Sequence, residues 1–272
     1  MPIAHSLSPV LHRAAYRELG LEWEYDAVQT DVESLPAFVQ GLGPEWRGLS
    51  LTMPLKRAVL PLLDASSETV RRSGAANTVL LTEHGLRSGH NTDVPGMVRA
   101  LGEHGVADVR SAVIVGGGAT ATSAVLALAR LGCREVTLRV REPARAQETV
   151  DVAGRLAEAP AVRVARLAEA GWQAVDVVVS TVPAAAQSPE VTESMVSQAA
   201  VVFDVVYDPW PTPVAAAGAA GGKVVVDGLG LLVHQAALQV ELMTGCEQAP
   251  LEEMRAAGEA ALQRSRRGEE TS

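Results

Sequence analysis

Short runs of consecutive apolar residues dominate the middle of the chain. They do not alternate with polar residues, which is typical of strands covered on both faces, as in a parallel sheet. The alanine-rich stretch 119–131, closed by Gly132, predicts a buried helix, and helical patterns recur at 144–158 and 190–199. Residues 100–228 are therefore expected to form one doubly wound α/β domain. The strands expected in it are 111–115, 135–140, 176–180, 201–204 and 223–226.

The two ends of the chain show a different pattern. Their apolar spacing predicts helices at 9–19 and 35–41, strands at 23–28 and 49–52, and further helices at 231–244 and 251–264. The last two helices have no strand pattern of their own, so they must pack on an earlier part of the chain. We therefore expect residues 1–99 and 229–272 to form a discontinuous second α/β domain.

Composition and charge exclude several classes of protein. With 47% hydrophobic and 20% charged residues the chain can bury a core, and its formal net charge of −9 argues against nucleic acid or an anionic membrane as a partner. No apolar run is long enough for a membrane span, and the first residues lack a signal-peptide pattern, so a cytoplasmic protein is expected. Cys133 and Cys246 lie too far apart for a disulfide framework, and the six histidines show no metal-ligand spacing, so no metal site is expected.

A glycine turn stands between the first expected strand of the central domain and its first helix. Gly116-x-Gly118-x-x-Ala121 fits the dinucleotide fingerprint of a Rossmann-type domain, in which glycine allows the backbone to approach a pyrophosphate at the helix N-terminus. A glycine turn without a ligand is the alternative. The residues expected to bind the dinucleotide here are Gly116, Gly117, Gly118, Ala119, Thr120 and Ala121.

The end of the second strand predicts which dinucleotide binds. Arg141 lies about twenty residues beyond the glycine turn, with Arg145 nearby, and a guanidinium at this place suits the 2′-phosphate of NADP. Glu142 is a negatively charged neighbour, and surface arginines without a ligand are the alternative interpretation. NADP is expected, and NAD remains the other option.

Two polar segments of the first domain combine reactive groups with ordinary structural explanations. Ser6 and Ser8 are two residues apart and point the same way if the segment is extended, although Ser8 before Pro9 also fits a helix N-cap. Lys56 falls in the first turn of a helix started by Pro54, where the helix dipole disfavours a cation. A solvated lysine is the alternative there.

Two further side chains fit a binding site. Asp93 precedes Val94 and Pro95 and fits a simple helix cap, whereas Gln235 shares a helix face with apolar residues. A buried amide without partners costs about 1–3 kcal/mol, so Gln235 is expected to bond a specific group. Next to a nucleotide domain, such an array of Ser, Thr, Asn, Asp, Gln and Lys groups suits a small polyhydroxy acid.

Seven motifs in this order resemble the shikimate dehydrogenase family over nearly the whole chain. The resemblance implies reversible reduction of 3-dehydroshikimate to shikimate with NADPH, on the route to chorismate and the aromatic amino acids. The motifs are His5-Ser-Leu-Ser-Pro9, Ser50-Leu-Thr-Met-Pro-Leu-Lys56, Gly74-Ala-Ala-Asn-Thr78, Asn91-Thr-Asp93, the glycine turn, Tyr207-Asp-Pro with Thr212-Pro213, and Asp227-Gly-Leu-Gly-Leu-Leu-Val-His-Gln235.

The resemblance also implies a role for each matching residue. It makes Lys56, as general acid/base, and Asp93 the catalytic pair. It implies that Ser6 and Ser8 bind the substrate carboxylate. The ring hydroxyls are then bound by Thr52, Asn77, Asp93 and Gln235. Tyr207 lies at the substrate and cofactor cleft. It implies that Arg141 and Arg145 hold the cofactor phosphate, and that Val205 and Gly228 line the nicotinamide.

The chain departs from the family pattern at two places. Ser50 stands where the family commonly has asparagine, and Val140-Arg141-Glu142 replaces the first three residues of its Asn-Arg-Thr-x-x-Arg/Lys phosphate motif. A quinate/shikimate dehydrogenase that uses NAD is therefore kept as an alternative, as is a nucleotide-binding sensor without catalysis. A monomer and a homodimer are both compatible with the sequence.

Overall fold

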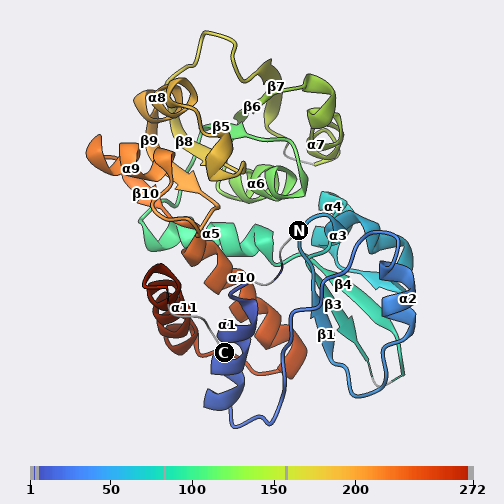
Figure 1. Ribbon diagram of the computed structural model, residues 1–272. Coiled ribbons are helices and arrows are strands. Elements are labelled where there is room, and N and C mark those ends of the chain that lie inside the picture. The colour runs from blue at the N-terminus through green and yellow to red at the C-terminus, as the bar shows by residue number, and fades with distance from the viewer. Residues whose placement is uncertain (1–2, 4–5, 83, 157–158, 269–272) are drawn as a thin grey trace. The chain divides into compact units, whose positions relative to one another are not determined.

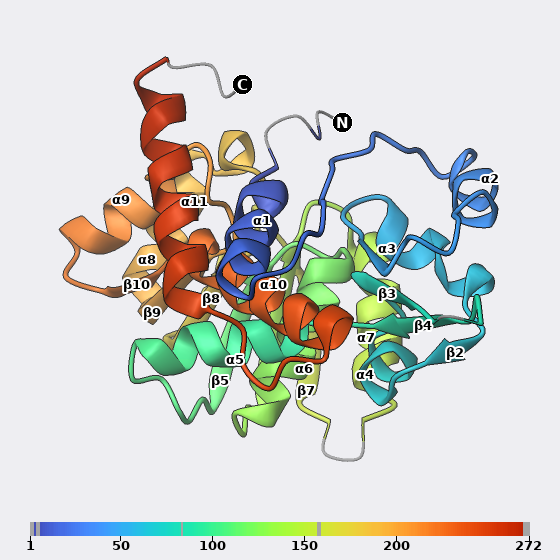
Figure 2. The ribbon, with the colours of Figure 1, turned by 90° about the horizontal axis from the view of Figure 1, so that it is seen from below.

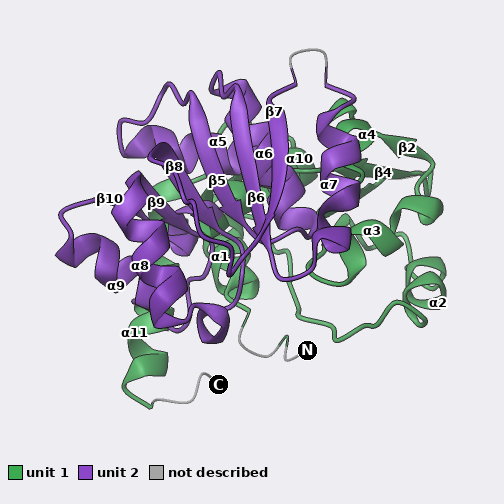
Figure 3. Ribbon diagram, turned by 90° about the horizontal axis from the view of Figure 1, so that it is seen from above, with its two compact units in different colours: residues 1–92, 232–272 green, residues 93–231 purple. Residues whose placement is uncertain are grey.

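The computed structural model describes residues 3, 6–82, 84–156 and 159–268. The chain divides into two compact units, Met1–Thr92 with Leu232–Ser272 (unit 1) and Asp93–Leu231 (unit 2), coloured separately in Figure 3. Among the described helices, none is long and apolar enough to cross a membrane.

Unit 2 is built on a six-stranded parallel sheet with the order β10-β9-β8-β5-β6-β7 (Figure 1). Counted from the first strand of the unit, this is the 3-2-1-4-5-6 order of a Rossmann fold, and the expected doubly wound domain is confirmed. The strands are β5 (Ser111–Val115), β6 (Glu135–Val140), β7 (Ala161–Arg166), β8 (Val175–Ser180), β9 (Ala199–Asp204) and β10 (Val224–Val226).

Helices cover both faces of this sheet. Ile114 of β5 belongs to the apolar cluster that contains Val125 of α6, whereas its neighbour Val113 belongs to the cluster that contains Met195 of α8. Successive strand residues thus enter two different cores, which explains why the sequence shows no alternation. The α-helices of the unit are α5 (Asp93–Glu103), α6 (Ala119–Arg130), α7 (Gln147–Ala153), α8 (Pro189–Gln198) and α9 (Pro213–Ala220).

Two elements of unit 2 differ from the sequence prediction. The helix expected at 144–158 is shorter, because a 3-10 turn (η3, Pro143–Ala146) precedes α7 and α7 ends before Gly154. Residues 157–158 of that prediction lie outside the described residues. Strand β7 was not predicted, and its exposed and half-buried residues alternate as in an edge strand.

Unit 1 contains a four-stranded sheet with the order β1-β3-β4-β2. Its β3 pairs antiparallel with β1 and β4, and β2 pairs parallel with β4. The strands are β1 (Gly48–Ser50), β2 (Ala65–Ser66), β3 (Thr78–Leu81) and β4 (Arg87–His90). Helix α1 lies beside α11 in both Figure 1 and Figure 2. The α-helices are α1 (Ser8–Glu18), α2 (Leu35–Gln40), α3 (Leu55–Ala58), α4 (Glu68–Ser73), α10 (Gly228–Thr244), which begins in unit 2, and α11 (Leu251–Arg266).

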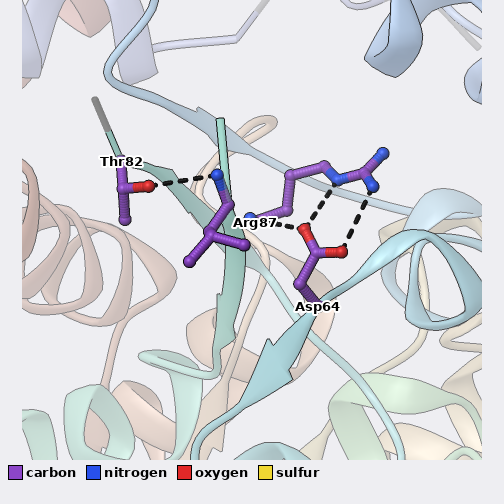
Figure 4. A network of polar contacts seen from close by, with 4 residues as sticks. Asp64, Thr82 and Arg87 are labelled. Atoms are coloured by element: carbon purple, nitrogen blue, oxygen red, sulfur yellow. Dashed lines mark hydrogen bonds and ion pairs between the residues drawn. The ribbon is translucent and has the colours of Figure 1, made fainter. Parts of the chain in front are cut away.

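An ion pair at the start of β2 joins it to β4 (Figure 4). The Asp64 carboxylate accepts from the backbone N–H of Arg87 at 2.8 Å and from its Nε at 3.1 Å. Beside it, the Thr82 hydroxyl accepts from the backbone N–H of Leu86 at 3.0 Å and closes the turn between β3 and β4. These contacts hold a short parallel edge strand that has only two residues of pairing.

The strand predicted at 23–28 is wrong. Residues 21–30 contain no helix or strand, although Trp23 and Tyr25 are half-buried between exposed acidic residues as the alternation predicted. Their aromatic rings pack on α1: Trp23 meets Tyr16 edge-on, and Tyr25 stacks on His12 with ring centroids 4.1 Å apart. The segment has the period of a strand, but it is anchored through side chains instead of a backbone ladder.

His12 is fully buried beneath Tyr25, and its Nδ1 donates to the backbone carbonyl of Ser8 at 2.9 Å. Burial lowers the pKa of His12 from 6.5 to about 4, against a smaller opposing contribution from the Ser8 hydrogen bond. The folded protein therefore keeps this imidazole neutral at a pH at which the unfolded chain binds a proton.

We predict that acidification destabilises unit 1 through His12. The stabilisation is complete above pH 6.5 and is lost as the pH falls toward about 4. Between pH 7 and pH 5 the loss attributable to His12 is about 2 kcal/mol of unfolding free energy. Urea unfolding at both pH values measures it, and His12→Phe, which keeps a ring against Tyr25, should lack this part of the slope. Equal slopes in the two proteins would contradict the assignment.

Candidate active site

The glycine turn joins β5 to α6 in a conformation that only residues without a side chain can adopt. Gly116 has φ +119°, and a Cβ added there would lie 2.1 Å from Thr181 Oγ1. A Cβ on Gly117 would lie 2.9 Å from the Arg145 carbonyl oxygen. Gly118 is the N-cap of α6, and since glycine has no side chain to cap it, the first N–H groups of the helix face outward. The turn therefore fits a bound pyrophosphate.

The arginines near the end of β6 have two different environments. Arg139 is buried, donates to the Arg166 carbonyl at 3.2 Å, and lies 4.5 Å from the ring centroid of Trp172, so it stabilises the domain. Arg141 and Arg145 are exposed beyond the strand end, where a phosphate can reach them. These two guanidinium groups and the glycine turn are the groups of unit 2 that fit the phosphates of NADP.

Two backbone segments, the end of β9 and the start of α10, also approach each other closely. A Cβ on Gly228 would lie 2.4 Å from the Val205 carbonyl oxygen, so only glycine fits against this backbone. Val205 itself donates its N–H to the Ser180 carbonyl at 3.1 Å. The two residues that the resemblance assigns to the nicotinamide are thus neighbours, and Tyr207 follows them half-buried.

In unit 1 the central polar group is the Asn77 amide, which is 1% exposed. Its Oδ1 accepts from the Thr92 backbone N–H and from Thr78 Oγ1, both at 2.8 Å. Its Nδ2 donates to Thr92 Oγ1 at 2.8 Å and to Gln235 Oε1 at 3.2 Å. The Thr92 N–H can only donate, so the orientation of the Asn77 amide is fixed. Gln235 has the specific partner that its buried position predicted, and its Nε2 donates to the Leu232 carbonyl at 2.8 Å.

Gln239 extends this network and was missed from the sequence. It is 1% exposed and lies one turn after Gln235 on α10. Its Nε2 donates to the Asn77 carbonyl at 3.2 Å and to Thr78 Oγ1 at 2.9 Å, and its Oε1 accepts from Ser50 Oγ at 2.9 Å. A second amide four residues after Gln235, in a mostly apolar helix, was the available signal.

Lys56 and Thr52 flank the start of α3. Lys56 is the second residue of this helix after the Pro54 N-cap, as the sequence predicted, and its side chain is half-buried. Its carbonyl accepts from the Ala76 N–H at 2.8 Å, which joins α3 to the residue before Asn77. Thr52 is exposed, and its carbonyl accepts from the Leu55 N–H at 2.8 Å.

Ser6 and Ser8 do not lie on an extended segment. Leu7 between them has helical dihedral angles, and the Ser8 N–H donates to Ser6 Oγ at 3.3 Å. The alternative that Ser8 caps the helix is wrong, because Ser8 is the first residue of α1 and makes no capping bond. Burial raises the pKa of Tyr25, and hydrogen-bonding interactions with the Ser50 and Ser8 side chains partly oppose this. Tyr25 therefore lies next to Ser50 and Ser8.

The predicted site residues divide between the two units. Asp93 is buried and forms the first residue of α5 in unit 2, so its pairing with Lys56 stays a prediction. In unit 1 lie Ser6, Ser8, Thr52, Lys56, Asn77 and Gln235. In unit 2 lie Asp93, Gly116, Gly117, Gly118, Ala119, Thr120, Ala121, Arg141, Arg145, Val205, Tyr207 and Gly228.

A separate cavity of about 540 Å³ lies in unit 1, beside β1 and residues 22–30. Its lining includes Tyr25 and Ser50 but not Lys56, Asn77 or Gln235, so it meets the polar network only at Ser50, which bonds Gln239. Within the described part of the chain, no group of three or more His, Cys, Asp or Glu side chains could hold a metal ion.

Two family models match the ends of the chain: the shikimate dehydrogenase substrate binding domain matches residues 1–79, and the shikimate 5′-dehydrogenase C-terminal domain matches residues 228–257. A curated relative, the shikimate dehydrogenase (NADP(+)) of Desulfitobacterium hafniense, is 35% identical over 269 residues, which is 96% of each chain.

Solved structures agree over the same length. The shikimate dehydrogenase of Mycobacterium tuberculosis has a TM-score of 0.86 and 40% identity over 95% of this chain and 96% of its own. The shikimate 5-dehydrogenase of Thermus thermophilus, solved in complex with NADP(H) and shikimate, has a TM-score of 0.83 and 32% identity over 96% of this chain and 97% of its own. Identity of 32–40% to these shikimate dehydrogenases across almost the entire length shows that the chain belongs to the shikimate dehydrogenase family.

Proposed function

We propose that this chain catalyses the reversible NADP-dependent reduction of 3-dehydroshikimate to shikimate, a step toward chorismate and the aromatic amino acids. The observation that carries the proposal is the similarity, over 96% of the chain, to an enzyme solved with NADP(H) and shikimate bound. We place the reaction in the cytoplasm, where NADPH-dependent biosynthesis takes place.

The reaction needs a hydride and a proton. Bound NADPH supplies the hydride, so the residues of the chain must hold the substrate and supply the proton. Lys56 is the proposed general acid/base, with Asp93 as its carboxylate partner. Lys56 and Lys223 are the only lysines among 23 Lys and Arg residues. Arginine stays protonated in proteins and cannot exchange a proton with substrate, so a lysine at position 56 in so arginine-rich a chain supports an acid/base role.

The remaining polar groups are proposed to hold the substrate. Ser6 and Ser8 are assigned to its carboxylate, with Tyr25 beside Ser8, and Tyr207 to the side facing the cofactor. The ring hydroxyls are assigned to Thr52, Asn77, Asp93 and Gln235. Both Nδ2 hydrogens and both acceptor positions of the Asn77 amide are used by Thr92, Gln235 and Thr78, so a substrate hydroxyl that binds Asn77 would replace one of these partners.

The alternative is oxidation of quinate or shikimate with NAD. Initial rates with shikimate and quinate, each against NADP and NAD, separate the two proposals. Fastest turnover with shikimate and NADP supports the first, and a preference for quinate and NAD supports the second. No turnover with any pair would favour a nucleotide-binding sensor. Sedimentation of the purified protein would separate a monomer from a homodimer.

We predict that Lys56→Ala lowers kcat by roughly 10²–10⁴-fold, because the proton donor is removed, with little change in NADPH affinity. Lys56→Arg should lose comparable activity although it keeps the positive charge. The matched control is Lys223→Ala, which removes the other lysine and should retain kcat. Steady-state kinetics measure the three variants, and near wild-type turnover in Lys56→Ala would reject the role.

We predict that Arg141→Ala weakens NADP binding by about 30-fold, equivalent to about 2 kcal/mol, because a charge-assisted bond to the 2′-phosphate is lost. NAD, which lacks that phosphate, should bind nearly as before. Arg134→Ala, which removes an exposed arginine just before the other end of β6, is the control. Equal weakening of NAD and NADP would contradict phosphate recognition.

We predict that Gln239→Leu raises KM for shikimate by roughly tenfold, with a much smaller change in kcat, because Ser50 and the Asn77 backbone carbonyl lose the amide that they bond. Gln187→Leu is the matched control: Gln187 is 4% exposed and bonds Ser180, Asp204 and Val214 within unit 2. That variant should lose stability without the same rise in KM. If both variants lose only stability, Gln239 has a structural role alone.

A further inference from the structure

A negatively charged side chain stands among the groups that fit the cofactor phosphate. The Glu142 carboxylate lies 3.4 Å from Arg145 Nε, and the Arg145 backbone N–H donates to the Glu142 carbonyl at 3.0 Å. Both side chains are about 70% exposed, at 69% and 71%. The backbone turn of η3 thus holds the two opposite charges together where β6 ends.

The backbone places this pair next to the dinucleotide turn. Gly117 approaches the Arg145 carbonyl so closely that a Cβ would be 2.9 Å away, and the Ala146 Cα would be 3.2 Å away. The segment that carries Glu142 and Arg145 therefore packs on the loop proposed for the pyrophosphate. A phosphate on the adjacent ribose has to compete with the Glu142 carboxylate for the Arg145 guanidinium.

Arg141 differs from Arg145 in this respect. It is exposed and takes part in no ion pair among the residues that the structure describes, so it can meet a phosphate without exchanging partners. Val140 cannot contribute a polar contact, because its side chain is apolar and 5% exposed. Arg141 and Arg145 are therefore the two arginines proposed for the 2′-phosphate, and Arg145 already has an anionic partner in Glu142.

We propose that Glu142 is a specificity-determining residue that weakens NADP binding and narrows the preference for NADP over NAD. The inference rests on the proposed cofactor site. Glu142 acts through its charge in two ways: it occupies Arg145, and it repels a phosphate that carries close to two negative charges. The same carboxylate does not weaken the binding of NAD, because it can accept a hydrogen bond from the ribose 2′-hydroxyl of NAD.

Direct titration of the purified protein with NADPH and with NADH, followed by nucleotide fluorescence without substrate, tests the proposal. Glu142→Gln keeps the shape and removes the charge, and it should bind NADPH roughly fivefold more tightly, with NADH affinity unchanged or lower. The gain should shrink at high salt, because the interaction is exposed and screened. Glu135→Gln is the matched control: it removes the same charge from the exposed opposite end of β6, seven residues before Glu142.

A double-mutant cycle tests the competition itself. Arg145→Gln should cost less NADPH affinity in the wild-type background, where Glu142 occupies Arg145, than in the Glu142→Gln background. Equal costs in both backgrounds, or unchanged NADPH affinity in Glu142→Gln, would overturn the inference while leaving the proposed function intact. A wild-type protein that binds neither nucleotide would overturn both.

Discussion

The arrangement of unit 1 depends on the fixed orientation of one buried amide, that of Asn77. Helix α10 comes from the far end of the sequence and must attach to a sheet made by residues 48–90. Apolar packing alone discriminates poorly between helix positions one turn, about 5.4 Å, apart. Gln235 and Gln239 bond directionally to Asn77 and Thr78, so a slip of one turn would leave several buried groups without partners, at about 1–3 kcal/mol each.

The same bonds fix the orientation of two predicted substrate residues. The Thr92 N–H and the Leu232 carbonyl are backbone groups with a single role each, and they fix the orientations of Asn77 and Gln235. Gln239 holds Ser50, which has a hydroxyl where the family commonly has an amide. In this chain Gln239 of α10 therefore supplies an amide beside position 50, where the family commonly has asparagine. The proposed cofactor site of unit 2 has a different physical basis, because it combines a turn of glycines without side chains and two exposed arginines.

The sequence predicted the parallel sheet of unit 2 well because its signals were local. Apolar runs such as 111–115 and the glycine turn require no knowledge of distant residues. The strand at 23–28 was mispredicted because period-2 burial also arises when Trp23 and Tyr25 dock on a helix. The sequence singled out Arg141 and Arg145, and the structure shows that the nearby Arg139 packs on Trp172 instead. Gln239 was missed because its partners, Ser50 and Thr78, are more than 150 residues away.

The two places where the chain passes between its units lie at or near predicted site residues. One passage is between Thr92 and Asp93, and the other is between Leu231 and Leu232 within α10. Thr92 is bonded to Asn77 through both its N–H and its hydroxyl, so the peptide bond that follows ties the buried Asp93 carboxylate to that network. Gln235 lies about one helical turn after the second passage. Residues at such passages stay covalently attached to both units, which is a physical reason to propose Asp93 and Gln235 as site residues.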